Sequence, residues 1–252
     1  MIAVSHLSKR YPGADTLSLD DVSFTVSEGE ICGLLGRNGA GKSTTLNILT
    51  GCLAPSSGHV EIDGIDLWTD PVQAKRKIGY APELPPLYPD MRLFEYLVFV
   101  CRAKSVSNPG EEAERVMEVT SMTRYASSRL AILSKGNRQR AGLAQALIGD
   151  PTILILDEPA NGLDPEQNAR LRALIAELGK KHTILLSSHI LSEVSLLCGR
   201  IVLLSQGRLA AEDTAEGLKK RAGKDTLEEA FLALTSQEQD DEEPPLKKRK
   251  KR

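Results

Sequence analysis

Two stretches of the sequence have residue types that bind phosphate groups. The first, GRNGAGKS, places Gly36, Gly41, Lys42 and Ser43 in the spacing G-x-x-x-x-G-K-[ST], after an apolar run and before a helical one. Glycines let the backbone curl until several N–H groups point at one anion, and the following helix adds its positive end. This stretch predicts a nucleotide site in which Lys42 reaches the β- and γ-phosphates and Ser43 binds Mg²⁺.

The second stretch, LSKGNRQR, covers residues 133–140 and puts a serine, a lysine and a glycine just ahead of the helical run RAGLAQALIGD. It is also suited to hold an anion at a helix N-terminus. If both stretches served one nucleotide within a single chain, the helical segment would have to fold back over Lys42. The sequence therefore raises the question of why one chain has two such places.

Two carboxylates end an apolar run, ILILDE, that predicts a buried strand. Open α/β sheets bind ligands at this C-terminal edge, so Asp157 can complete the Mg²⁺ shell with Ser43. Glu158 points the other way and can poise a water for attack on the γ-phosphate. The alternative is that this acid pair caps the next helix. His189 ends another buried strand at the same edge and can contact the γ-phosphate or the water, unless it is a structural histidine.

The elements around these residues predict an α/β fold. The runs ICGLLG, TILILDEP and HTILLSSH are nearly continuous in apolar residues, and helical patterns separate them, which is typical of a parallel sheet. Residues 1–30 and 58–67 alternate apolar and polar residues, as in half-exposed strands. Residues 84–150 carry apolar residues at helical spacing after a proline-rich loop. A hairpin over 201–213 and a helix, LEEAFLAL, follow.

The composition is that of an ordinary soluble globular domain. Of 252 residues, 41% are hydrophobic and 26% charged, and the net charge of −2 predicts no general attraction to nucleic acid. The four cysteines are scattered, so we expect neither a zinc site nor a disulfide framework. We expect no signal peptide and no membrane span. The tail SQEQDDEEPPLKKRKKR predicts a solvated, disordered segment; attraction of its basic end to anionic lipid is the alternative.

The phosphate loop, LSKGN, LILDEP, NGLD and SSH occur in the order and spacing found in ATP-binding-cassette (ABC) transporters, and no N-K-x-D element of GTPases is present. Over about residues 1–235 the sequence resembles the nucleotide-binding subunits of that family. The resemblance implies a P-loop NTPase (RecA-like) core with a parallel sheet, an N-terminal antiparallel β subdomain and an inserted α-helical subdomain. The implied divisions are a core of 1–83 and 151–213, a helical signature subdomain of 84–150, C-terminal helices of 214–235 and a tail of 236–252.

The resemblance also implies roles for individual residues. Tyr11 matches the aromatic that stacks on adenine, unless it is an ordinary strand-end tyrosine. Glu83, in IGYAPE, stands where most members have a glutamine that senses Mg²⁺ and couples to the membrane partner. Asp157 and Glu158 match the Mg²⁺ ligand and the catalytic base, and His189 matches the switch histidine. The remaining matches contact phosphate or cross to the other subunit, and they are Asn38, Gly39, Gly41, Lys42, Ser43, Thr44, Ser134, Gly136 and Asp164.

The sequence departs from the commonest signature, LSGGQ, because Lys135 and Asn137 replace a glycine and the glutamine. These departures, together with Glu83, PLYPDM and TLEEAFLAL, make the sequence similar to the single-cassette ATPases of multidrug and gliding-motility exporters. The resemblance implies an ATPase that pairs with a second copy around two ATP molecules, so that Lys42 of one copy and Ser134–Gly136 of the other hold the same γ-phosphate.

In that role the subunit would use ATP and Mg²⁺ and drive a separate membrane permease. It would lie peripherally at the cytoplasmic face of the inner membrane, with no nucleic-acid partner. Two alternatives stay open. One is a soluble ABC ATPase acting in iron–sulfur assembly, translation or repair. The other is a regulatory protein that binds ATP without turnover, against which the presence of Glu158 and His189 argues.

Overall fold

The structure is a computed structural model that describes residues 1–236. The prediction of a disordered tail falls outside the described residues, apart from Ser236, which ends the last helix. The strands are β1 (Ile2–Lys9), β2 (Leu19–Val26), β3 (Ile31–Leu35), β4 (Ser57–Ile62), β5 (Ile65–Asp66), β6 (Ile78–Ala81), β7 (Ile153–Asp157), β8 (Thr183–Ser188), β9 (Arg200–Ser205) and β10 (Arg208–Asp213).

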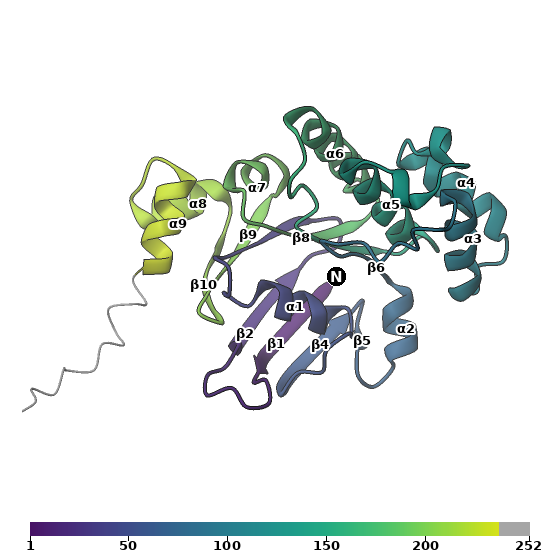
Figure 1. Ribbon diagram of the computed structural model, residues 1–252. Coiled ribbons are helices and arrows are strands. Elements are labelled where there is room, and N and C mark those ends of the chain that lie inside the picture. Colours follow the sequence, from purple (N-terminus) through teal and green to yellow (C-terminus); the bar gives the residue numbers. More distant parts are fainter. Residues whose placement is uncertain (237–252) are drawn as a thin grey trace, which may run out of the picture.

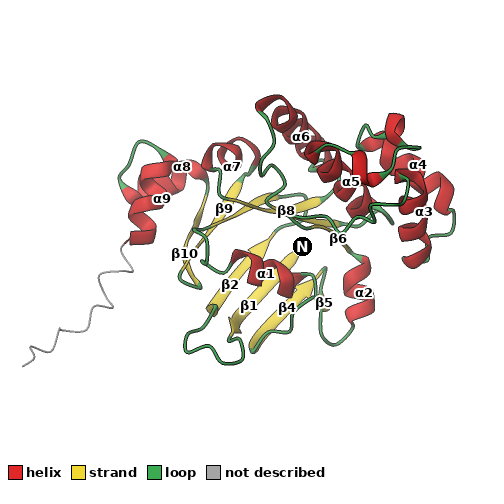
Figure 2. Cartoon of the chain, in the orientation of Figure 1, coloured by secondary structure: helices red, strands yellow, loops and turns green. Residues whose placement is uncertain are grey.

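The helices begin with α1, which follows the phosphate loop, and end with α9, which is separated from the last strand by the short helix α8. They are α1 (Lys42–Leu49), α2 (Pro71–Arg76), α3 (Leu93–Ala103), α4 (Pro109–Val119), α5 (Lys135–Leu147), α6 (Pro165–Leu178), α7 (Leu191–Leu197), α8 (Ala215–Ala222) and α9 (Leu227–Ser236), with 3₁₀ turns at Thr123–Tyr125 and Leu130–Ile132. Figure 2 shows the helices and strands of the chain in separate colours.

The central sheet has the strand order β10-β9-β3-β8-β7-β6 and is parallel except for β10, which pairs with β9 as a hairpin. Side chains of a strand alternate between its faces, so a strand covered on both sides needs apolar residues throughout. In β7, Ile153 and Ile155 enter one core cluster, and Leu154 and Leu156 enter the other. This alternation accounts for the unbroken apolar run ahead of Asp157.

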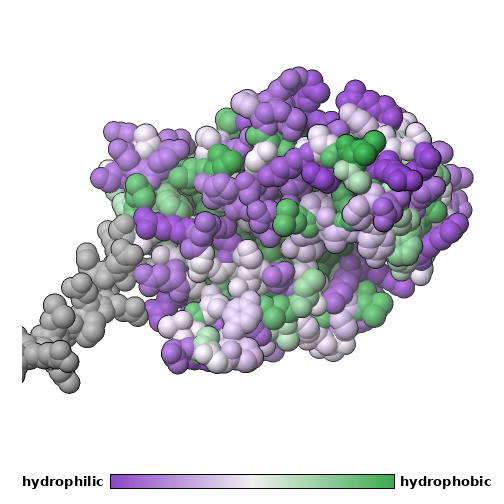
Figure 3. All heavy atoms as spheres, in the orientation of Figure 1, coloured by the Kyte–Doolittle hydropathy of each residue, from purple (hydrophilic) through white to green (hydrophobic). Residues whose placement is uncertain are grey.

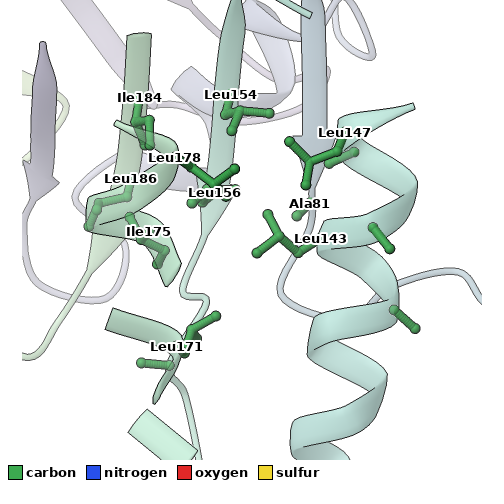
Figure 4. Close-up of a cluster of buried hydrophobic side chains, with 14 of the residues drawn as sticks. Ala81, Leu143, Leu147, Leu154, Leu156, Leu171, Ile175, Leu178, Ile184 and Leu186 are labelled. Carbon is green, nitrogen blue, oxygen red and sulfur yellow. The ribbon is translucent and has the colours of Figure 1, made fainter. Parts of the chain in front are cut away.

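The two core clusters lie on opposite faces of the central sheet. On one face, Leu154 and Leu156 pack with side chains of α5 and α6, among them Leu143 and Ile175 (Figure 4). On the other, α1 lies between the central sheet and a second sheet of order β2-β1-β4-β5, which is antiparallel (Figure 1). Both ends of the phosphate loop are therefore anchored in buried structure.

Helix α5 begins earlier than the sequence indicates. The pattern predicts a helix that starts at Arg140, but the structure starts it at Lys135, with Ser134 as N-cap. The Ser134 hydroxyl accepts a hydrogen bond from the Asn137 backbone N–H at 3.3 Å, which satisfies one of the free N–H groups of the first turn. The consequence is that the whole LSKGN stretch belongs to the helix end itself.

The predicted fold class is confirmed by the α/β architecture of parallel and antiparallel sheets with helices inserted between β6 and β7. In residues 1–236 no helix is long and apolar enough to cross a membrane. The surface of the face in Figure 3 is mostly hydrophilic, with hydrophobic side chains gathered in small groups.

Arg200, the first residue of β9, fastens the antiparallel sheet to the central one. Its guanidinium donates to the Thr25 backbone oxygen at 2.6 Å and to both carboxylate oxygens of Glu30 at 2.7 and 2.8 Å, and it also pairs with Glu212. The hydrogen bonds from Arg200 hold the pKa of Glu30 below its ordinary value of 4.5. The ionised carboxylate thus stabilises the folded state.

We expect Glu30→Gln to lower the free energy of unfolding by about 1–3 kcal/mol at neutral pH, because a charge-assisted bond to Arg200 is lost. A lowered pKa means that wild-type Glu30 contributes this stability above pH 4.5 and loses it as the pH falls through the lower folded-state pKa. Urea unfolding of both proteins across this range measures the difference. Glu177→Gln, which removes an exposed charge paired with Lys180, should change stability by less than about 0.5 kcal/mol. Equal losses in the two variants would contradict this account of Arg200.

Candidate functional site

The phosphate loop connects β3 to α1 and turns through residues 36–41. Gly41, at φ +105°, caps α1, and a Cβ at this position would lie 2.6 Å from a Leu19 methyl and 2.9 Å from the Ser18 carbonyl oxygen. Glycine is therefore required both by the backbone conformation and by the space. The Lys42 side chain is only 7% exposed, and its ammonium donates to the Gly36 carbonyl at 2.8 Å. The backbone of the predicted phosphate-binding loop therefore holds the Lys42 ammonium.

A cavity of about 870 Å³ opens over this loop. It collects predicted residues from segments far apart in the sequence, and these are Asn38, Gly39, Gly41, Lys42, Ser43, Thr44, Glu83, Glu158 and His189. The ends of β3, β6, β7 and β8 deliver them, because parallel strands present their carboxyl ends at one edge of the sheet. Its volume is that of a small-molecule pocket.

Asp157 lies behind the cavity wall. Its side chain accepts a 2.6 Å hydrogen bond from Ser187, which is opposite it in the pairing of β7 with β8. Burial raises the pKa of Asp157 above its ordinary value, and the nearby charges of Glu158 and Glu83 raise it further, although Ser187 and Lys42 act in the opposite direction. A cation bound beside Asp157 would stabilise this carboxylate in its ionised form.

Glu158 takes its direction from a turn and not from the alternation of the strand. It follows the last residue of β7 with φ +46°, a left-handed conformation that costs a non-glycine residue about 1–2 kcal/mol. Its backbone N–H donates to the Ser187 carbonyl at 3.2 Å and to the Ser187 hydroxyl at 2.9 Å. Ser187 therefore forms hydrogen bonds with both carboxylate residues. The sequence predicts that strand alternation sets the direction of the Glu158 side chain, but in the structure this turn sets it.

Glu158 and His189 contact each other directly. One oxygen of the Glu158 carboxylate lies 2.7 Å from His189 Nδ1 and accepts from the His189 backbone N–H at 3.2 Å, while the other lies 3.9 Å from the Lys42 ammonium. The Glu158 side chain is 12% exposed, whereas that of His189 is 49% exposed. A carboxylate with few other partners beside a histidine is suited to accept a proton from a bound water. Neither acid of the pair caps a helix, so the alternative use as an N-cap does not occur.

Glu83 follows β6 and reaches the cavity from the side of the helical segment. Its carboxylate accepts a 2.7 Å bond from the Asn161 amide, and its backbone oxygen accepts a 2.8 Å bond from the Gln139 amide of α5. Glu83 is thus tied both to the loop after Glu158 and to helix α5, which begins at Lys135. A movement of α5 would therefore displace Glu83 through the bond from Gln139.

Tyr11 and Asp164 do not line the cavity over the phosphate loop. The Tyr11 hydroxyl is 3.4 Å from the Thr44 hydroxyl, and the residue is 38% exposed, so an aromatic side chain is accessible next to the phosphate loop. Asp164 is the N-cap of α6 and accepts from the Gln167 N–H at 2.8 Å. Helix capping, proposed above for the other acids, is done here by Asp164.

Ser134 and Gly136 do not share the cavity of Lys42. With Asn137, Gln167 and three arginines (Arg124, Arg140 and Arg170) they line a second cavity of about 210 Å³. The side chain of Lys135 lies against Gly162 in the NGLD loop, and the amide of Gln167 packs on Gly136. The LSKGN stretch therefore packs on the loop that follows Glu158, yet lines a different cavity.

Sequence reasoning missed three residues that shape the site. Ser187 could be found only from the register that sets it opposite Asp157. For Asn161, which donates a hydrogen bond to Glu83, the only signal in the sequence is its position in the NGLD motif. Phe231, on α9, lines the Lys42 cavity and had no signal beyond an apolar helix pattern.

The available ligands fit Mg²⁺. Ser43, Asp157 and Glu83 offer a hydroxyl and two carboxylates, the hard oxygen donors that this ion prefers. Among residues 1–236 no group of three or more His, Cys, Asp and Glu side chains is close enough to hold a metal by itself. Mg²⁺ is usually bound by one or two carboxylates together with substrate phosphates and water.

Comparison with known proteins gives a consistent result. The family described as "ABC transporter" matches residues 19–161. The bacitracin transport ATP-binding protein BcrA of Bacillus licheniformis is 37% identical over 227 residues, which are 89% of this chain and 73% of BcrA. The Nod factor export ATP-binding protein I of Burkholderia lata is 36% identical, over 88% of this chain and 74% of the relative.

Solved structures agree in fold. A structure described as the ATP-binding subunit of an ABC transporter superposes with a TM-score of 0.83 and 34% identity, over 93% of this chain and 99% of its own. The ATP-binding cassette MJ0796, solved as a dimer in a post-hydrolysis state with ADP and Pi, gives 0.77 and 25% identity, over 85% and 98%. The chain therefore belongs to the ABC transporter family, as one of its ATP-binding and ATP-hydrolysing cassettes.

Proposed function

We propose that two copies of this chain close around two ATP molecules, hydrolyse them and drive a separate membrane permease that exports its substrate. The observation that carries the proposal is the division of the site. Lys42, Glu158 and His189 face one cavity, and Ser134 and Gly136 face another, so a complete site needs the second stretch from a second chain. The dimer of MJ0796 and the names of the transport and export relatives support it.

In the proposed site, Asn38, Gly39, Gly41, Lys42 and Thr44 bind the phosphates of ATP, and Tyr11 stacks on the adenine. Ser43, Asp157 and Glu83 hold Mg²⁺, which neutralises phosphate charge. Glu158 accepts a proton from the attacking water, and His189 orients Glu158 through the contact between them. Ser134 and Gly136 of the other copy face the γ-phosphate, and Asp164 reaches across the interface.

The same proposal covers the place of the subunit. It would dock on its permease as a peripheral protein at the cytoplasmic face of the inner membrane, with Glu83 linking the nucleotide site to that contact. Residues 1–83 and 151–213 would form the core, 84–150 the signature subdomain and 214–235 the C-terminal helices. None of the relatives described above favours a soluble role in iron–sulfur assembly, translation or repair.

The test is affinity purification of the tagged chain from native membranes. We expect a polytopic membrane protein to co-purify and Mg²⁺-dependent ATP hydrolysis in the eluate. Lys42→Ala should still bring down the membrane protein but should hydrolyse ATP at least about a hundredfold more slowly, because the cation that contacts the phosphates is gone. Recovery of the chain alone, always from the soluble fraction, would contradict the transporter role.

A further inference from the structure

The last described helix, α9, reaches the ATP cavity. Helix α9 packs against α7, α8, β9 and β10, at the side of the molecule away from α3 and α4 (Figure 1). Phe231 of this helix lines the cavity together with His189 and Leu191, while every other described lining residue lies between Ser18 and Leu191 in the sequence. One wall of the site is therefore supplied from the C-terminal end of the described chain.

This wall is apolar and lies beside the hydrolytic groups. Leu191 is the first residue of α7 and follows His189 by two positions. Leu191 and Phe231 are both partly buried and pack against the same hydrophobic core cluster. Helices α7 and α9, which carry these two residues, also pack against each other, so the segment after His189 is joined to the C-terminal helices.

His189 needs such support, because burial alone does not fix its ring. About half of its side chain is exposed, and its contacts within the site go to one atom, the Oε2 oxygen of Glu158, from the ring and from the backbone N–H. A pair of contacts to a single oxygen leaves the segment free to tilt about that point. An apolar wall behind the segment would remove this freedom and would also keep bulk water from the carboxylate.

We propose that Phe231 is a positioning residue for ATP hydrolysis: with Leu191 it holds His189 against Glu158 and limits access of bulk water, so that α9 sets the rate of hydrolysis. The inference rests on the proposed roles of Glu158 and His189. Phe231 acts through these residues and not through the phosphate loop. Nucleotide binding is therefore independent of it, whereas the chemical step depends on it.

The first experiment compares Phe231→Ala with Leu232→Ala. Leu232 is the next residue of α9, is 50% exposed and is not part of the cavity wall. We expect Phe231→Ala to lower kcat roughly tenfold, since small displacements of catalytic groups are costly, with the affinity for a fluorescent ATP analogue changed by less than about twofold. Phe231→Leu should restore most of kcat. Full kcat in Phe231→Ala, or an equal loss in Leu232→Ala, would overturn the proposal.

A second experiment reports the position of residue 231 directly. Trp68 is the only tryptophan of the sequence, so Trp68→Phe with Phe231→Trp leaves a single reporter on α9. Its emission should change when a non-hydrolysable ATP analogue binds, and a reporter placed by Leu232→Trp should respond less. An unresponsive reporter at 231, with analogue binding intact, would overturn this inference alone. If Glu158→Gln also left hydrolysis unchanged, the proposed catalytic roles would fall with it.

Discussion

Replacement of Glu158 by glutamine is expected to slow ATP hydrolysis by about a hundredfold to ten-thousandfold, the range in which a general base contributes. Glutamine keeps the shape of the side chain and can accept the hydrogen bond from His189, so the 2.7 Å contact and the fold should persist. It cannot accept a proton from water. The variant should bind ATP as tightly as the wild type and accumulate as an ATP-bound dimer, because closure is no longer followed by cleavage.

Rapid-quench assays of ATP cleavage and size-exclusion chromatography with ATP and Mg²⁺ would measure the two effects. Glu177→Gln, an exposed acid near the end of α6, is the matched control and should retain both the wild-type rate and the wild-type elution profile. Unchanged hydrolysis in Glu158→Gln would remove Glu158 as the base. Slow hydrolysis without an accumulated dimer would support Glu158 as the base but would contradict closure of two chains around ATP.

Replacement of Ser134 by arginine should abolish hydrolysis while a single subunit still binds ATP. The hydroxyl of Ser134 caps α5 beside a cavity of about 210 Å³, where a guanidinium would fill much of the space in front of the helix end. The ATP affinity of the monomer should change by less than about twofold, since the phosphate loop faces the other cavity. Nucleotide titration at concentrations too low for pairing separates binding from turnover.

Loss of the cap by itself costs about 1 kcal/mol, so a control must remove the hydroxyl without adding bulk. Ser134→Ala serves this purpose and should destabilise the protein about as much as arginine does, yet leave measurable hydrolysis. If Ser134→Arg lost ATP binding in the monomer, the LSKGN stretch would act within its own chain, and the composite site would be wrong.

Much of the site could be predicted from the sequence because its chemistry is local. The phosphate loop carries its own turn residues and its own helix, and the buried strands ahead of Asp157 and His189 are visible as apolar runs. Helix α2 was missed, although Asp70 accepts from the Gln73 N–H and Pro71 stands at the first helical position, a start signal present in the sequence.

The remainder depends on contacts between distant segments, which no local pattern encodes. The hydrogen bonds of Ser187 with Asp157 and Glu158 follow from the register of β7 against β8. The turn at Glu158 is stabilised by that neighbouring strand and not by its own sequence. The presence of Phe231 in the wall of the cavity that His189 also lines requires the C-terminal helices to fold back over β9 and β10, and only the assembled fold brings them there.

The separation of the two cavities within one chain has a genetic consequence. Let one allele carry Glu158→Gln and a second allele carry Ser134→Arg, each inactive when expressed alone. In a mixed dimer one composite site receives both lesions, and the other pairs the intact Lys42 cavity of the Ser134→Arg chain with the intact Ser134 cavity of the Glu158→Gln chain. Two null alleles should then complement in trans, and up to half of the sites in such dimers would work.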